Sequence, residues 1–87
     1  MQQFNLEYQY QQYLQRVGLT EEQMHEIQRT ETRRAFMGAC ANILFLVAED
    51  IPQLDDEQAV ATLDDMLRQA VDFWKKEAHN LHFGNGN

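Results

Sequence analysis

The stretch Ala35–Ala48, AFMGACANILFLVA, is apolar on nearly every side of the helix that its pattern predicts. A helix that is hydrophobic all round must be enclosed all round. The chain has 87 residues, and a domain of this size buries only a modest fraction of the surface of its unfolded chain. The stretch therefore predicts a protein that buries part of its apolar surface against copies of itself or a partner. The alternative interpretation is that it forms the deep core of a monomer.

Helical periodicity dominates the first half of the chain, and the alternation typical of β-strands is absent. Apolar residues at helical spacing predict a first helix from about Leu6 to Val17. Thr20 and Gln23 match a capping box and predict the start of a second helix. This helix is expected to end near Glu49, because a proline follows two residues after Asp50. The fold class is therefore all-α.

A third helix is expected to begin after Asp55, which is a good N-cap residue with Gln58 three positions later. Its wide apolar stripe continues to about Ala78, and residues 79–87 lose the periodicity. We therefore expect a single three-helix domain over residues 1–78, followed by a flexible tail over residues 79–87.

The expected lengths of the helices constrain their packing. At 1.5 Å per residue the three helices are about 18, 45 and 34 Å long. The connection between the second and third helices is short, so we expect an antiparallel hairpin, with the first helix against one half of it. This three-helix bundle leaves the C-terminal half of the second helix covered on one side only. The residues that we expect at an oligomer interface are Met37, Ile43, Leu44, Phe45, Leu46 and Val47.

Charge and cysteine content restrict the partners and the compartment. The formal net charge is −7, which disfavours binding to duplex nucleic acid or to an anionic membrane. The apolar stretch is also shorter than the roughly 20 residues that span a bilayer. The single cysteine, Cys40, cannot form an internal disulfide and suits a reducing compartment. We therefore expect a cytoplasmic protein without a membrane anchor.

Three arginines lie within two turns of the second helix, just before the apolar stretch. Guanidinium groups bind phosphate or carboxylate through two parallel hydrogen bonds, and aromatic rings beside them can stack a base. The predicted packing brings them near tyrosines of the first helix, which predicts a site for a small nucleotide-like ligand. The candidate residues are Arg29, Arg33, Arg34, Tyr8, Tyr10 and Tyr13. The alternative is a solvated ion-pair face, with Glu26, Glu31 and His25 as local partners, and tyrosines that pack in the core.

No motif predicts catalysis, a metal site or a cofactor. Cys40 lacks the basic surroundings that activate a thiol. Glu22 and His25 form a single i, i+3 pair on a polar turn, whereas di-iron bundles need two such pairs. We therefore expect a non-enzymatic binding protein. A second hypothesis starts from the acidic residues of the third helix, which suit an inhibitor that docks on a basic partner protein.

The run QMHEIQRTETRRAFMGACANILFLVAEDI, followed by an acidic helix that ends in DFWKKE, resembles small uncharacterised helical proteins of phages and mobile elements. The layout of a short helix before a long hairpin is also similar to that of phage-encoded sponge proteins, which form oligomers and sequester cyclic nucleotide signals. This likeness is one of architecture, and no ligand residue carries over. It implies an anti-defence accessory protein of the host cytoplasm. The acidic alternative implies an inhibitor of the anti-CRISPR or DNA-mimic type.

Overall fold

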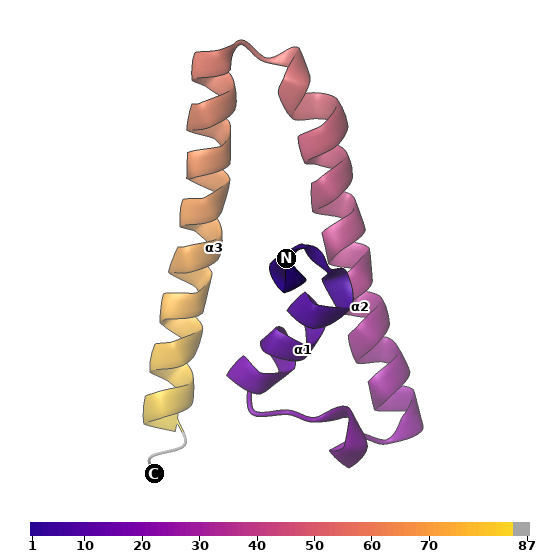
Figure 1. Ribbon diagram of the computed structural model, residues 1–87. Helices are drawn as coiled ribbons and strands as arrows, with labels where there is room; N and C mark the ends of the chain where they lie inside the picture. Colours follow the sequence, from indigo (N-terminus) through magenta and orange to yellow (C-terminus); the bar gives the residue numbers. More distant parts are fainter. Residues whose placement is uncertain (85–87) are drawn as a thin grey trace. The chain divides into compact units, whose positions relative to one another are not determined.

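Three α-helices form most of the chain in the computed structural model, which describes the backbone of residues 1–84 and the side chains of residues 1–79. They are α1 (Leu6–Arg16), α2 (Glu26–Phe45) and α3 (Asp56–Gly84) (Figure 1). Over the described backbone, every other regular segment is a short 3₁₀ or π turn. The prediction of an all-α chain with three helices is confirmed.

Both ends of α1 lie where the sequence places them. The side chain of Asn5 accepts a hydrogen bond from the Tyr8 N–H at 3.0 Å and caps the first turn, which follows the 3₁₀ turn η1 (Gln2–Phe4). Gly18 has a φ of 73° at the other end. The Leu19 N–H bonds to the Leu14 carbonyl at 2.9 Å across that glycine, which closes a Schellman motif.

The start of the second helix differs from the prediction. Residues Glu21–Gln23 form a single 3₁₀ turn, η2, and α2 begins only at Glu26. The side chain of Thr20 makes no capping hydrogen bond, so the predicted capping box is wrong. An extended backbone at Met24 instead turns its side chain into the core, where it is 6% exposed. Burial of this long apolar side chain outweighs the local capping preference.

The end of α2 widens before the chain turns. One π turn, η3 (Leu46–Asp50), follows Phe45, and a 3₁₀ turn, η4 (Ile51–Gln53), follows that. Proline lies inside η4, where its missing N–H breaks the α-helical hydrogen-bond pattern. The α-helix therefore ends at Phe45, four residues before the predicted end near Glu49, and turns of other helical types continue past that position.

Helical conformation continues from Glu26 to Gln53, a length of 28 residues that includes η3 and η4. A window of 18 residues within it has a mean hydropathy of 1.4, and 6% of that window is buried. By length and composition alone, this is a helix that can cross a membrane. This helical segment is longer than the apolar stretch Ala35–Ala48, whose length was the reason to expect no membrane span.

The start of α3 confirms the prediction, and its end does not. Asp55 Oδ1 accepts a hydrogen bond from the Gln58 N–H at 2.8 Å. The helix then continues to Gly84, past the predicted end at Ala78. Neither glycine nor proline interrupts the chain between these two positions, so nothing in the backbone stops propagation. Residues 85–87 of the predicted tail lie outside the described residues.

The chain divides into two units, Met1–Leu46 and a second unit that begins at Val47. In the first unit α1 packs on the N-terminal half of α2 (Figure 1). Tyr10 and Leu14 of α1 are its two fully buried side chains. The ring of Phe36 lies 5.3 Å from that of Tyr10 and 5.6 Å from that of Tyr13. The predicted contact of the first two helices is thus confirmed, whereas the bundle and the single domain stay predictions.

The second unit is simpler. Its α3 contacts η4, where Ile51 is buried. Most of the large apolar side chains that the structure describes on α3 are exposed, among them Val60 and Leu67. This unit therefore has a small core and exposes a large apolar surface along its helix.

Leu14→Ala should lower the free energy of unfolding by about 2–5 kcal/mol, because it opens a cavity in the core of the first unit. Leu6→Ala is the control in the same helix, since the Leu6 side chain is 41% exposed, and it should cost about 1 kcal/mol or less. Urea unfolding followed by circular dichroism measures both values. Equal losses in the two variants would contradict the placement of the core.

Candidate functional site on the N-terminal half of α2

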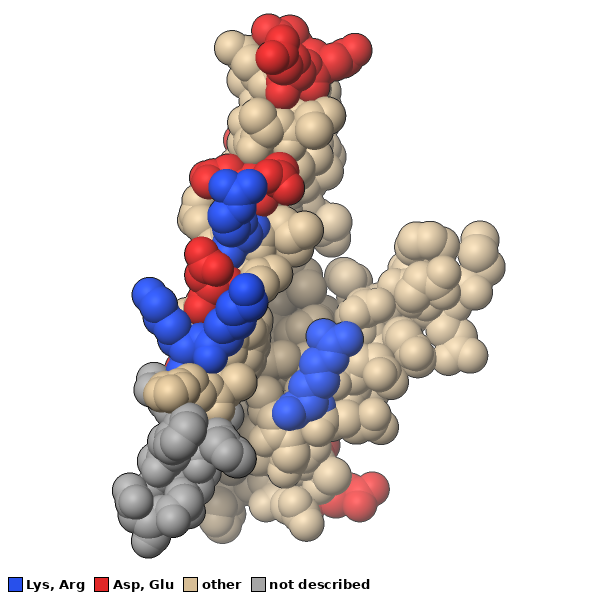
Figure 2. Space-filling model, turned by 90° about the vertical axis from the view of Figure 1, so that its left-hand side faces the viewer, with Lys and Arg blue, Asp and Glu red and all other residues tan. Residues whose placement is uncertain are grey.

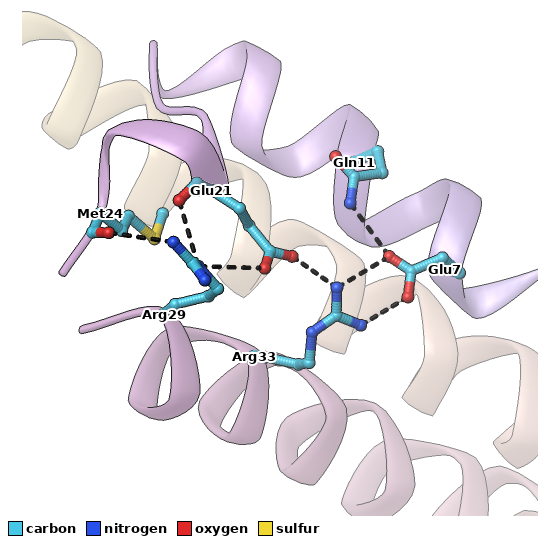
Figure 3. Close-up of polar contacts among 6 residues, drawn as sticks. All are labelled: Glu7, Gln11, Glu21, Met24, Arg29 and Arg33. Atoms are coloured by element: carbon cyan, nitrogen blue, oxygen red, sulfur yellow. Dashed lines mark hydrogen bonds and ion pairs between the residues drawn. The ribbon is translucent and has the colours of Figure 1, made fainter. Parts of the chain in front are cut away.

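Arg33 joins three segments of the first unit. Its Nη1 and Nη2 atoms donate to the two carboxylate oxygens of Glu7 in α1, at 2.5 and 3.2 Å (Figure 3). Its Nη2 atom also donates to the carboxylate of Glu21 in η2. A planar guanidinium presents its N–H groups in a fixed fork, which matches two carboxylates better than an ammonium group does. Arg33 therefore fixes α1 and η2 against α2.

Arg29 lies one turn earlier on α2 and holds the backbone of the η2 segment. Its Nε donates to the Glu21 carbonyl and its Nη2 to the Met24 carbonyl, each at 3.2 Å (Figure 3). Its Nε also lies 3.9 Å from the carboxylate of Glu21. These bonds fix the first residue of η2 and the residue that follows η2 against α2. We call Glu7, Tyr10, Glu21, Arg29 and Arg33 the Arg33 cluster.

Tyr10 is the enclosed member of the Arg33 cluster. The Arg33 Cζ atom lies 4.7 Å from the centre of the Tyr10 ring, a distance typical of a cation–π contact. The ring is fully buried and its hydroxyl oxygen is enclosed. Burial, and then the negative charge of Glu21, raise the pKa of Tyr10 above its ordinary value of 10.0. A ring in this position supports the core and is not open for stacking with a base.

The ion pairs of Arg33 perturb the ionisation of the groups that make them. Hydrogen bonds from Arg33, and then from Gln11, lower the pKa of Glu7 below its ordinary value of 4.5. Hydrogen bonds to Glu7 and Glu21 raise the pKa of Arg33 further. Both changes favour the charged forms of Glu7 and Arg33, as expected for an ion pair at neutral pH.

The structure places the predicted ligand residues in different surroundings. Arg33, Arg29 and Tyr10 take part in the network, and Tyr13 packs on Phe36. Arg34 is the most exposed of the three arginines and pairs with Glu31 at 2.9 Å, as the ion-pair alternative expects. Tyr8 is half-buried.

The sequence pattern does not predict the two carboxylates that bind Arg33. Glu7 lies 26 positions and Glu21 lies 12 positions from Arg33 along the chain. Only the packing of α1 and η2 on α2 brings them together. Helical spacing predicts Glu31 as the partner of Arg34, but the two partners of Arg33 are too distant in sequence to be predicted in this way.

A shallow depression lies beside the cluster on α2. Its volume is about 420 Å³, and it opens to solvent. The residues that line it are Arg29, Thr30, Arg33, Arg34 and Met37. Its positive charge suits a small anion, although Arg33 already binds two carboxylates.

The predicted interface residues also fall into two sets. Ile43, Leu44 and Phe45 are 45%, 51% and 69% exposed, and Val47 is exposed to a smaller extent. Met37 packs against the core of the first unit, and Leu46 is half-buried. The exposed set adjoins a strip of small exposed residues on α2, where a Cβ added at Gly38 would meet no atom within 4 Å.

Among the residues that the structure describes, no group of three His, Cys, Asp or Glu side chains is placed to hold a metal ion. Comparison of the chain with protein-family models, with curated proteins and with solved structures finds no match. The resemblance to phage proteins therefore stays a prediction.

Glu7→Gln should flatten the dependence of stability on acid pH. Because Arg33 lowers the folded-state pKa of Glu7, the ion pair stabilises the fold above about pH 4.5 and is lost as the pH falls through the lowered pKa. The variant should be less stable at neutral pH and lose less stability below that range. Urea unfolding at a series of pH values measures this, with Glu22→Gln as the control. Parallel curves for Glu7→Gln and the unmodified chain would contradict the ion pair.

Proposed function

We propose that the chain is a non-enzymatic binding protein that acts as a homo-oligomer, with the apolar end of α2 at the contact between subunits. The observation that carries this proposal is the exposure of Ile43, Leu44 and Phe45 on consecutive positions of one helix. Full burial of each such side chain would contribute about 1.5–3 kcal/mol of favourable free energy, relative to its exposure to water. A domain of this size has a total stability of only about 5–15 kcal/mol.

The shape of α2 supports a second helix as the occupant of this surface. Ala35, Gly38 and Ala39 are exposed at the N-terminal side of the apolar residues. Small residues at helical spacing let a second helix approach closely, and larger side chains beside them fill the grooves. A second copy supplies both the small strip and the apolar side chains that cover it.

A lipid bilayer is the competing occupant, because the helical segment Glu26–Gln53 is long and apolar enough to span one. The net charge of −7 opposes approach to anionic lipid surfaces. The polar side chain of Asn42 and the charges of Glu49 and Asp50 also fall within this segment, and such groups are costly in hydrocarbon. We therefore favour self-assembly, and binding to lipid vesicles tests the alternative.

Phe45→Glu should weaken the assembly by roughly 30-fold in dissociation constant, which corresponds to about 2 kcal/mol of lost apolar burial. The high exposure of Phe45 means that the monomer fold tolerates the change, whereas Leu46 is half-buried and less suitable. Analytical ultracentrifugation measures the effect. Ile27→Glu is the matched control, because Ile27 is 79% exposed on α2 but lies outside the apolar stretch.

Two results would overturn the proposal. The first is a folded monomer of the unmodified chain at micromolar concentration. The second is flotation of the unmodified chain with neutral phosphatidylcholine vesicles that Phe45→Glu abolishes, which would assign the surface to lipid.

A second candidate function, binding of a small nucleotide-like anion, is favoured by the depression between Arg29 and Arg34. Arg34 is its most available cation, since it is 71% exposed and has one exposed carboxylate partner. The occupied fork of Arg33 and the buried ring of Tyr10 make this candidate weaker than self-assembly. The third hypothesis, an acidic inhibitor that docks on a basic protein, stays a prediction.

Calorimetric titration with cyclic and linear nucleotides tests the second candidate. Arg34→Gln should weaken any binding at least about tenfold, because it removes one charge-assisted contact worth roughly 1.5–3 kcal/mol. Arg68→Gln is the matched control, as Arg68 is 66% exposed and pairs with one carboxylate on α3. Absence of heat and of any change in melting temperature across the panel would exclude the site.

A further inference from the structure

Among the residues of α3 whose side chains the structure describes, five large apolar side chains are exposed on one face. They are Val60, Leu63, Leu67, Val71 and Trp74. Their spacings along the chain are three, four, four and three residues, which keeps all five on one stripe of an α-helix. Val60 and Leu67, at 68% and 63%, are the most exposed. This stripe belongs to the second unit, whereas Ile43, Leu44 and Phe45 belong to the first.

The order of spacings is the same in both directions along the helix, with Leu67 at its centre. Reversal of the helix places Val60 at the level of Trp74 and Leu63 at the level of Val71. A second α3 that runs in the opposite direction therefore presents the same stripe, level by level. A surface that matches itself in this way suits an isologous contact with two-fold symmetry.

The charges of α3 select the antiparallel direction. Residues 55–67 include five acidic and no basic side chains, and residues 68–79 include three basic and two acidic ones. Figure 2 shows acidic side chains at the upper end of the face that α3 presents, and Lys and Arg side chains nearer its lower end. An antiparallel pair places the acidic half of each helix beside the more basic half of the other, whereas a parallel pair places like halves together.

Individual charges on one flank of the stripe agree with this arrangement. At 100° per residue, Glu57, Asp64, Arg68 and Lys75 lie within about 40° of one another around the helix. Symmetry about Leu67 brings Glu57 within about 3 Å, along the axis, of the level of Lys75 in the second copy. It brings Asp64 equally near the level of Arg68. Asp64 and Arg68 of one chain already lie 2.7 Å apart, so both are oriented along this flank.

We propose that α3 pairs with α3 of a second copy, antiparallel and with Leu67 at the two-fold axis. The five-residue stripe forms the dry centre of this contact, and the four charged residues of the flank form ion pairs along one edge. The inference rests on the proposed self-assembly, but it uses another helix, so the two contacts can fail separately.

Cysteine cross-linking tests the direction and the register. In a Cys40→Ala background, Val60→Cys and Trp74→Cys are prepared as separate proteins and oxidised alone and mixed. Antiparallel pairing predicts a mixed disulfide between the two proteins, since their Cβ atoms face each other at one level. Each protein alone should form few disulfides, because like positions are about 21 Å apart along the axis. Circular dichroism verifies that each variant remains helical.

A second variant measures the contact without relying on Trp74. Leu67→Glu places two carboxylates at the axis and should weaken association at least about tenfold in ultracentrifugation, while Asp72→Lys, away from the stripe, should not. Self-cross-linked proteins in the separate oxidations would establish a parallel pair and overturn the proposal. Absence of the mixed disulfide, together with unchanged association of Leu67→Glu, would also overturn it. If Phe45→Glu still dissociates the assembly in that case, the α2 contact stands without the α3 contact.

Discussion

The first unit depends on the fork of hydrogen bonds from Arg33 to Glu7 and Glu21. The cluster of buried residues in this unit contains three side chains, Tyr10, Leu14 and Met24, so apolar packing alone fixes the helices weakly. Arg33 joins α1, η2 and α2 at one point and also lies over the ring of Tyr10. A guanidinium group can do this because its donors are rigidly arranged and always charged. Beside a core this small, the partly exposed ion pairs of Arg33 are an additional link among the three segments.

Most of the fold is predictable from local signals. Asn5, Gly18 and Asp55 act at helix ends through their own backbone neighbours, so a reader of the sequence can place α1 and the start of α3. The start of α2, in contrast, is not determined by the neighbouring residues alone. Thr20 and Gln23 form a good capping pattern, but Met24 gains more by entering the core. A tertiary gain of this kind has no signature in the neighbouring residues.

The candidate site was predictable in its composition but not in its connections. The three arginines of α2 stand out in an acidic chain, and Arg34 has the partner expected from helical spacing. The partners of Arg33 come from segments that are distant in sequence. Because Glu7 and Glu21 bind the guanidinium group of Arg33, a pattern that resembles an anion-binding site forms an intramolecular ion-pair network instead. The exposed apolar residues of α2, in contrast, follow directly from a stretch too hydrophobic for one small chain to cover.

The π turn η3 spans the boundary of the two units, because it begins at Leu46, the last residue of the first, and continues through Val47–Asp50 of the second. A π turn is an α-helical turn that has taken in one additional residue without breaking the helix. Evolution can therefore lengthen or shorten the chain at this point by one residue without unfolding either unit. Each such change moves every later side chain of the same helical segment by about 100° around the helix axis. Insertion or deletion of one residue in η3 thus changes which side chains at the end of this helical segment share a face with Ile43, Leu44 and Phe45.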